Sequence, residues 1–166
     1  MQEKVILVNE HDEAIGVMDK LEAHEKGFLH RAFSVFVFNQ QGQLLLQQRA
    51  LHKYHSAGLW TNTCCSHPRV GEGNEAAAHR RLKEEMGFDT DLTYLNALLY
   101  RAEFDNNLTE HEYDHLFTGQ YNGEPNINPD EVAAYRWVNL AEVKSDLQKN
   151  PAKYTAWFKL ALEKFF

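Results

Sequence analysis

Short hydrophobic stretches separated by polar turns predict most of the strands in this chain. Such stretches occupy residues 5–9, 15–18, 31–38, 44–48, 94–104, 113–121 and 134–138. Many of their residues are β-branched or aromatic, which favours extended structure. The polar, glycine-containing residues 39–42 separate the third and fourth stretches, so we expect that pair to form a hairpin.

Residues 20–30 have weak periodicity and are expected to form a helical turn and a loop. Residues 51–68 are expected to be irregular, apart from an extended piece near 60–64.

Helix signals occur in three places. The clearest helix follows Asn74, which is expected to be its N-cap, and ends at Gly87. Asn139 is expected to cap a second helix that runs through Lys149, and Pro151 is expected to start a third. The third segment has apolar residues at helical spacing, namely Tyr154, Trp157, Phe158, Ala161, Leu162 and Phe165. These elements predict an α+β fold, an α/β/α sandwich in which helices flank a mixed sheet.

The chain length favours a single domain that spans residues 1–166. Repeats, low-complexity tracts and Pro/Gly/Ser-rich linkers are absent from the sequence. Its longest apolar run, residues 33–38, is far shorter than the ~20 residues of a membrane helix. The first residues lack the pattern of a secretory signal. Cys64 and Cys65 are adjacent in the sequence and cannot close an ordinary disulfide loop, and unpaired thiols fit a reducing compartment. We therefore expect a cytoplasmic protein without membrane contact.

The net charge of −7 argues against a nonspecific nucleic-acid binder. It leaves room for a phosphorylated small molecule, because a local cluster of basic residues can hold one. The sequence has no exposed heptad pattern or long apolar edge, so we expect a monomer.

Nine histidines are many for this length and raise the question of a metal site. Glu110 and Glu112 lie two apart in a predicted strand, so both project from one face while His111 points away. Two carboxylates on one face repel each other unless a cation lies between them. Together with His24, His30 and His67 they would suit Zn²⁺, Mn²⁺ or Fe²⁺ better than Ca²⁺. The alternative is a solvated loop and an acidic strand end that never meet.

The clearest helix carries an altered phosphate-handling motif. Its residues Glu72, Arg80, Leu82, Glu84, Glu85, Gly87 and Phe88 match the pattern E-x7-R-x-U-x-E-E-x-G-U, where U is bulky and apolar. This resembles the Nudix box, with Ser66 in place of its first glycine and Arg81 in place of a catalytic glutamate. Arg81 and Glu85 lie one helical turn apart, either as an exposed ion pair worth a few tenths of a kcal/mol or as a clamp for Mg²⁺ and a diphosphate.

The two thiols admit a catalytic and a structural interpretation. A thiol with an ordinary pKa of ~8.5 is mostly protonated at neutral pH and can donate a proton, and its thiolate can accept one. An isolated cysteine is more commonly a small buried hydrophobic residue. Neighbouring residues point in different directions, so at most one of Cys64 and Cys65 is expected to face a given site.

Several motifs occur in an order that resembles the type I isopentenyl-diphosphate Δ-isomerases, a family with the Nudix fold. The resemblance extends from about residue 5 to residue 157. It rests on residues 29–34, 44–50, 64–68, the altered Nudix box, 110–112 and 157–158.

The resemblance implies roles for individual residues. His24, His30, His67, Glu110 and Glu112 would bind a divalent ion, Zn²⁺ or Mn²⁺, and Glu85 would hold a Mg²⁺ that bridges to the diphosphate. Lys20, Arg49, Lys53, Ser66 and Arg81 would contact the diphosphate. Cys65 and Glu112 would be catalytic, with Tyr100 assisting.

The implied reaction interconverts isopentenyl and dimethylallyl diphosphate by protonation at one carbon and deprotonation at another. Because a tertiary carbocation forms during this reaction, the site must exclude water and supply π-rich walls. The candidates for these walls are Trp60, Tyr100 and Trp157. Their alternative role is packing in the hydrophobic core. His55 is assigned a structural role, together with the other histidines outside the metal set. His52 and His55 would at most add to the positive field near Lys53.

Two alternative functions stay open. A divergent Nudix hydrolase of nucleoside or prenyl diphosphates would use Glu84 and Glu85, but it leaves Arg81 and the pairing of Cys65 with Glu112 unexplained. A noncatalytic metal-binding or phosphate-binding module would make the thiol incidental.

Overall fold

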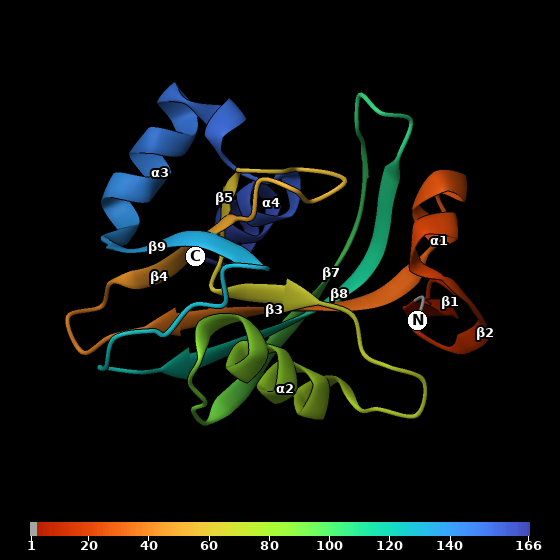
Figure 1. Ribbon diagram of the computed structural model, residues 1–166, viewed down its shortest axis with the longest axis horizontal. Helices are drawn as coiled ribbons and strands as arrows, with labels where there is room; N and C mark the ends of the chain where they lie inside the picture. Colours follow the sequence, from red (N-terminus) through yellow and green to blue (C-terminus); the bar gives the residue numbers. More distant parts are fainter. Residues whose placement is uncertain (1–2) are drawn as a thin grey trace.

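The computed structural model describes residues 3–166, and a mixed sheet lies at its centre (Figure 1). The strands are β1 (Lys4–Val8), β2 (Ala14–Asp19), β3 (His30–Phe38), β4 (Leu44–Arg49), β5 (Trp60–Thr61), β6 (Cys64–Ser66), β7 (Leu92–Glu103), β8 (Thr109–Gln120) and β9 (Val132–Val138). The helices are α1 (Lys20–Lys26), α2 (Asn74–Met86), α3 (Leu140–Lys149) and α4 (Ala156–Phe165), with a 3₁₀ turn at Pro151–Lys153. Every helix within residues 3–166 is too short or too polar to cross a membrane.

Alternating side chains of the central strands divide the core into two layers. Phe36 on β3 packs with Leu44 and Leu116 beneath α3 and α4. Their chain neighbours Val35 and Phe117 point to the opposite face, which α2 covers. Because side chains alternate along a strand, each central strand serves both layers. Figure 1 shows α2 on one side of the sheet and α3 and α4 on the other, which confirms the expected α/β/α sandwich.

β3 organises the sheet and the site. It runs parallel to β8, with His30 opposite Glu112, and antiparallel to β6, with Ser34 opposite Cys65. The expected hairpin between residues 31–38 and 44–48 is confirmed only at its turn, because the two strands share one register pair, Phe38 with Leu44. Beyond that pair the edges of β3 are occupied by β6 and β8, while β4 pairs with β9.

Two expected helix starts are wrong. Gly73 occupies the N-cap of α2, so Asn74 is the first helical residue and not the cap. Pro151 starts only the 3₁₀ turn, and α4 begins at Ala156 with Thr155 as its N-cap. The chain is extended in between because the amide of Thr155 donates to the carbonyl of Trp60 at 3.0 Å. Asn139 caps α3, and Gly87 ends α2 in the left-handed conformation, as expected.

Candidate active site

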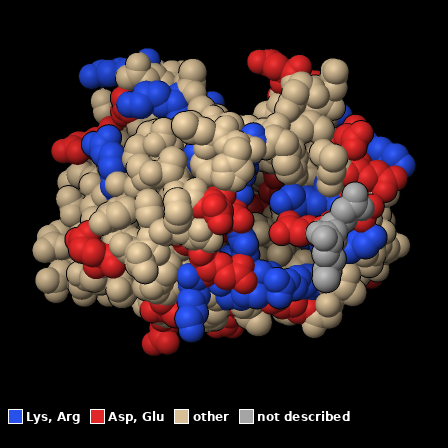
Figure 2. Space-filling model, in the orientation of Figure 1, with Lys and Arg blue, Asp and Glu red and all other residues tan. Residues whose placement is uncertain are grey.

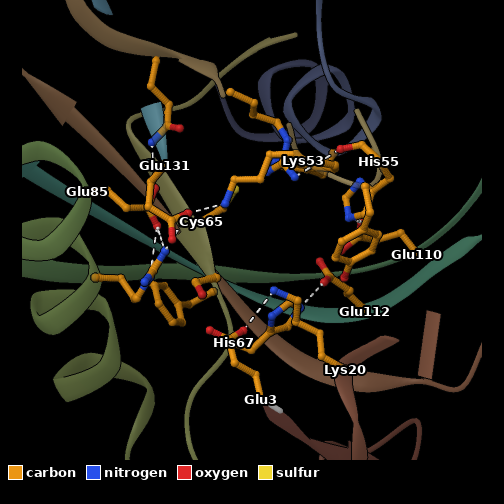
Figure 3. A pocket seen from close by; sticks show the side chains of 17 residues that line it. Glu3, Lys20, Lys53, His55, Cys65, His67, Glu85, Glu110, Glu112 and Glu131 are labelled. Atoms are coloured by element: carbon orange, nitrogen blue, oxygen red, sulfur yellow. Dashed lines mark hydrogen bonds and ion pairs between the residues drawn. The ribbon is translucent and has the colours of Figure 1, made fainter. Parts of the chain in front are cut away.

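A cavity collects most of the expected site residues from distant parts of the chain (Figure 3). Basic and acidic side chains are interleaved on the molecular face drawn in Figure 2. The expected residues that line the cavity are Lys20, Arg49, Lys53, Cys65, Ser66, His67, Arg81, Glu85, Glu110, Glu112 and Trp157. Three others, His24, His30 and Tyr100, are buried directly behind Glu110 and Glu112.

The three histidines and two glutamates of the expected metal set form one cluster. Their candidate ligand atoms all lie within 4.8 Å of one another. Nε2 of His30 and Nε2 of His67 lie 3.2 Å and 2.8 Å from the same oxygen of Glu112, Oε2. Nε2 of His24 lies 3.5 Å from Oε1 of Glu110. The alternative of a solvated loop and a separate acidic strand end is therefore wrong.

Backbone carbonyls orient two of these rings. Nδ1 of His24 lies 2.6 Å from the carbonyl of Lys20, and Nδ1 of His30 lies 2.9 Å from the carbonyl of Phe28. A proton on each Nδ1 satisfies these carbonyls and leaves the Nε2 lone pair directed into the cluster, as in metal-binding histidines.

Unpartnered atoms test whether a metal fits. Nε2 of His24 and Oε2 of Glu110 are buried and receive no hydrogen bond from any residue within 3–166. A buried polar atom without a partner is costly, and a cation would satisfy both at once. The mixture of imidazole and carboxylate donors suits a divalent transition ion such as Zn²⁺ or Mn²⁺.

Mutual charges shift the pKa values in the cluster. Burial would raise the pKa of Glu112, but its polar neighbours, among them the donating hydroxyl of Tyr100, outweigh it and lower the pKa to about 2. Burial is the main cause that keeps the pKa of His67 well below its ordinary value. Glu112 is therefore ionised and His67 neutral at neutral pH, which are the forms that bind a cation.

The two cysteines separate as expected. Cys65 lines the cavity, whereas Cys64 is fully buried in the layer beneath α2. Burial is the main cause that raises the pKa of the Cys65 thiol, so the thiol is protonated at neutral pH. Glu112 accepts a hydrogen bond from the Tyr100 hydroxyl at 2.5 Å. Because β6 and β8 lie on opposite edges of β3, Cys65 and Glu112 reach the cavity from two sides.

The basic residues line different parts of the cavity: Lys53 and Arg81 both contact Glu131, whereas Lys20 lies beside Glu3 (Figure 3). Arg81 donates to Oε2 of Glu85 at 2.8 Å, and both side chains are largely buried. The alternative of an exposed surface ion pair is therefore wrong. Oε1 of Glu85 accepts a hydrogen bond from Gln47 at 2.9 Å, which fixes the carboxylate. The guanidinium of Arg49 lies 5.4 Å from the ring centroid of Trp157.

The burial of His55 fits the structural role expected for it, whereas its expected contribution to the positive charge near Lys53 is wrong. Its ring is buried against Phe104, and its Nε2 lies 3.2 Å from Oε2 of Glu110. Burial lowers its pKa to about 3, so it adds no positive charge near Lys53. No motif marked His55, because its contact with Glu110 joins residues far apart in the chain.

Other residues also differ from their expected placement. Of the three aromatic residues expected as cavity walls, only Trp157 belongs to the lining within residues 3–166. Trp60 and Tyr100 pack in or against the core beneath α4, so the wall role expected for these two is wrong. His111 points away from the cluster, as the strand alternation predicted, and its Nδ1 lies 3.1 Å from the carbonyl of Gly27. Six further lining residues were not among the expected site residues, namely Glu3, Phe33, Gln47, Tyr54, His55 and Glu131.

Comparisons with known proteins agree with this architecture. Residues 28–158 match the family model described as NUDIX domain. A structure from Deinococcus radiodurans superposes with a TM-score of 0.83 at 18% identity, covering 99% of both chains. A MutT protein from Methanosarcina mazei superposes with a TM-score of 0.67 at 19% identity, covering 82% of this chain and 92% of that one. At these identities the structural likeness establishes the fold.

Sequence relatives are much closer. Isopentenyl-diphosphate Delta-isomerase 2 of Photorhabdus laumondii is 57% identical over 96% of this chain and 90% of its own length. Isopentenyl-diphosphate Delta-isomerase of Pectobacterium atrosepticum is 53% identical over 95% of this chain and 88% of its own. With a Nudix fold, an arginine at a catalytic position of the Nudix box, and such relatives, the chain belongs to the type I isopentenyl-diphosphate Δ-isomerase family.

Proposed function

We propose that Cys65 and Glu112 carry the two proton transfers by which this isomerase interconverts isopentenyl and dimethylallyl diphosphate in isoprenoid biosynthesis. One observation carries the proposal: the thiol and the carboxylate enter one cavity from opposite edges of β3, and four cations line the same cavity. A five-carbon chain whose diphosphate is held by those cations would have its carbons between the two groups. One group adds a proton at C4 and the other removes one at C2, and their roles exchange in the reverse reaction.

The aromatic wall and the tyrosine complete this assignment. Protonation of an alkene leaves a tertiary cation, which the face of Trp157 can stabilise by about 2 kcal/mol in a dry site. Trp157 is 3% exposed and lines the cavity. Tyr100 donates its hydroxyl to Glu112 and so orients the carboxylate that faces the substrate.

Two ions fit the chain's residues. His24, His30, His67, Glu110 and Glu112 would hold Zn²⁺ or Mn²⁺, which when bound supplies a positive charge that fixes Glu112 and shifts the acidity of the groups around it. Glu85, beside Arg81, would hold a Mg²⁺ shared with the substrate diphosphate. Lys20, Arg49, Lys53, Ser66 and Arg81 would bind the diphosphate oxygens.

The partner is a small prenyl diphosphate, and we propose that the protein acts as a cytoplasmic monomer without nucleic acid or membrane. Neither alternative function accounts for the arrangement. A hydrolase needs no thiol opposite a buried carboxylate, and Arg81 replaces a catalytic acid of the Nudix box.

The test incubates the purified protein with isopentenyl diphosphate and Mg²⁺ and follows dimethylallyl diphosphate and inorganic phosphate separately. We expect double-bond migration without phosphate release. Phosphate release without migration would favour the hydrolase, and neither product would favour a binding module.

A further inference from the structure

Most of the cations that are proposed to bind the diphosphate are already paired with carboxylates in this structure. Four cations line the cavity, namely Lys20, Arg49, Lys53 and Arg81. Three of these four cations are paired within it: Lys20 with Glu3 at 2.9 Å, Arg81 with Glu85 at 2.8 Å, and Lys53 with Glu131.

Among Glu3, Glu85 and Glu131, Glu131 is the carboxylate that contacts two of the cations proposed to bind the diphosphate. Its Oε2 contacts the ammonium of Lys53 and lies 3.3 Å from a guanidinium nitrogen of Arg81, so one oxygen joins two proposed diphosphate ligands (Figure 3). The side chain is 26% exposed and lines the cavity. A diphosphate oxygen that bound both Lys53 and Arg81 would take the place of this carboxylate oxygen.

The backbone holds Glu131 there. Its carbonyl accepts the amide of Ala50 at 3.1 Å, and its amide donates to the carbonyl of Asn128 at 3.0 Å. Asn128 in turn donates to the carbonyl of Glu85 at 2.9 Å. The loop before β9 is thus tied to β4 and to the end of α2, and the carboxylate of Glu131 is a fixed part of the site.

The charge balance then decides what can bind. Among the cavity-lining residues within 3–166, these four cations are accompanied by five carboxylates: Glu110 and Glu112 of the His/Glu cluster, and Glu3, Glu85 and Glu131 outside it. Even with the two cluster carboxylates set aside, a single positive charge remains, and it is too small to balance a diphosphate, which carries several negative charges. A bare diphosphate would also be brought against the carboxylate of Glu131, and like charges at such distances repel strongly where water is scarce.

We propose that Glu131 makes diphosphate binding depend on a divalent cation. Without the cation, Glu131 keeps Lys53 and Arg81 paired and repels the diphosphate. With it, the added positive charge offsets Glu131 and frees Lys53 and Arg81 for the diphosphate oxygens. Glu131 is a positioning residue that acts through these two cations. The inference rests on the proposed diphosphate substrate and assigns the site its selectivity for a cation-bound diphosphate.

The test measures binding of inorganic pyrophosphate to the full chain by calorimetry, without added Mg²⁺ and with excess Mg²⁺. It compares the unchanged protein with Glu131→Gln, which removes the charge and keeps the shape. Glu124→Gln is the matched control, because Glu124 lies in the same loop, is exposed and pairs with Tyr135 outside the cavity lining. Metal content before and after each titration confirms that the pyrophosphate has not stripped the His/Glu cluster.

Without Mg²⁺ we expect Glu131→Gln to bind pyrophosphate about tenfold more tightly than the unchanged protein. With excess Mg²⁺ we expect this difference to shrink to about threefold or less. Glu131→Asp, which keeps the charge, should retain the Mg²⁺ dependence and guards against a folding defect in the glutamine variant. Glu124→Gln should behave as the unchanged protein.

Equal affinity of Glu131→Gln and the unchanged protein without Mg²⁺ would overturn the inference. Weaker binding by Glu131→Gln in both conditions would also overturn it. Failure of the proposed function looks different: the unchanged protein would neither bind pyrophosphate with Mg²⁺ nor move the double bond.

Discussion

The thiol and the carboxylate at the cavity have environments that suit opposite protonation states. Burial raises the pKa of Cys65 and keeps its thiol protonated. The polar neighbours of Glu112 lower its pKa and keep its carboxylate ionised. We expect Cys65→Ala and Glu112→Gln each to lower turnover by about 10³-fold or more, because each removes one of the two proposed proton-transfer groups. Turnover is measured as dimethylallyl diphosphate formed from isopentenyl diphosphate.

Cys64→Ala is the matched control for the thiol. Cys64 is buried beneath α2 and does not reach the cavity, so the substitution should leave turnover nearly unchanged. Near-normal turnover in Cys65→Ala would refute the role of that thiol.

The proposed role of Tyr100 depends on its hydrogen bond to Glu112. Tyr100→Phe removes the hydroxyl that donates to Glu112 at 2.5 Å and keeps the buried ring. We expect turnover to fall about ten- to a hundredfold, as when an outer partner of a metal-binding group is lost. The melting temperature should change little. A variant with unchanged turnover would show that Glu112 does not need this orientation.

At the scale of elements, α4 depends on Thr155, its N-cap, which lies where the chain passes beside β5 before the helix begins. The Thr155 hydroxyl accepts the amide of Phe158 and lies 2.8 Å from the hydroxyl of Thr61, and both threonines are fully buried. We expect Thr155→Ala to lower the free energy of unfolding by about 1–2 kcal/mol, because it removes the cap and leaves a buried hydroxyl less well satisfied. Urea denaturation measures this loss. Thr155→Ser keeps the hydroxyl and should lose much less.

The entry to α2 gives a pH-dependent prediction. Hydrogen bonds from Arg80 to both carboxylate oxygens of Glu72 lower the pKa of Glu72 in the folded protein. A lowered carboxyl pKa stabilises the fold above the ordinary pKa, and this stability is lost as the pH falls through the lowered value. Between about pH 5 and about pH 3, the free energy of unfolding should therefore fall less steeply in Glu72→Gln than in the unchanged protein. Parallel curves would contradict this role of Glu72.

At the scale of the whole molecule, the His/Glu cluster joins segments that the chain keeps apart. Its members come from α1, β3, the loop after β6, and β8. A bound ion would thus stabilise the fold, by about 2.7 kcal/mol at a concentration of 100 times its Kd. We expect chelation to lower the melting temperature and turnover together, and Zn²⁺ or Mn²⁺ to restore both.

Elemental analysis provides the second measurement for the metal site. His24→Ala should lose the bound transition ion, whereas His79→Ala, which removes a histidine paired with Asp89 away from the cluster, should keep it. Full activity of a metal-free protein would exclude the site as a requirement for turnover.

Local sequence signals predicted the elements well and their ends less well. Asn139 and Gly87 act where capping chemistry places them. The start of α4 was missed because it is set by the hydrogen bond from Thr155 to the carbonyl of Trp60, two residues that lie far apart in the chain. The position of Trp60 was also predicted wrongly, because an aromatic ring can pack in the core as well as line a cavity, and its residue type does not distinguish the two.

The sequence by itself determined the strand faces, the clearest helix, the altered Nudix box and the family, because each is written in residue types at fixed spacing. It also placed Glu110 and Glu112 on one side of their strand. Only the tertiary structure decided that His55 lies against Glu110 and that Glu131 joins Lys53 to Arg81. Such contacts depend on strand register and loop attachment across the whole chain, and no local pattern of residues encodes them.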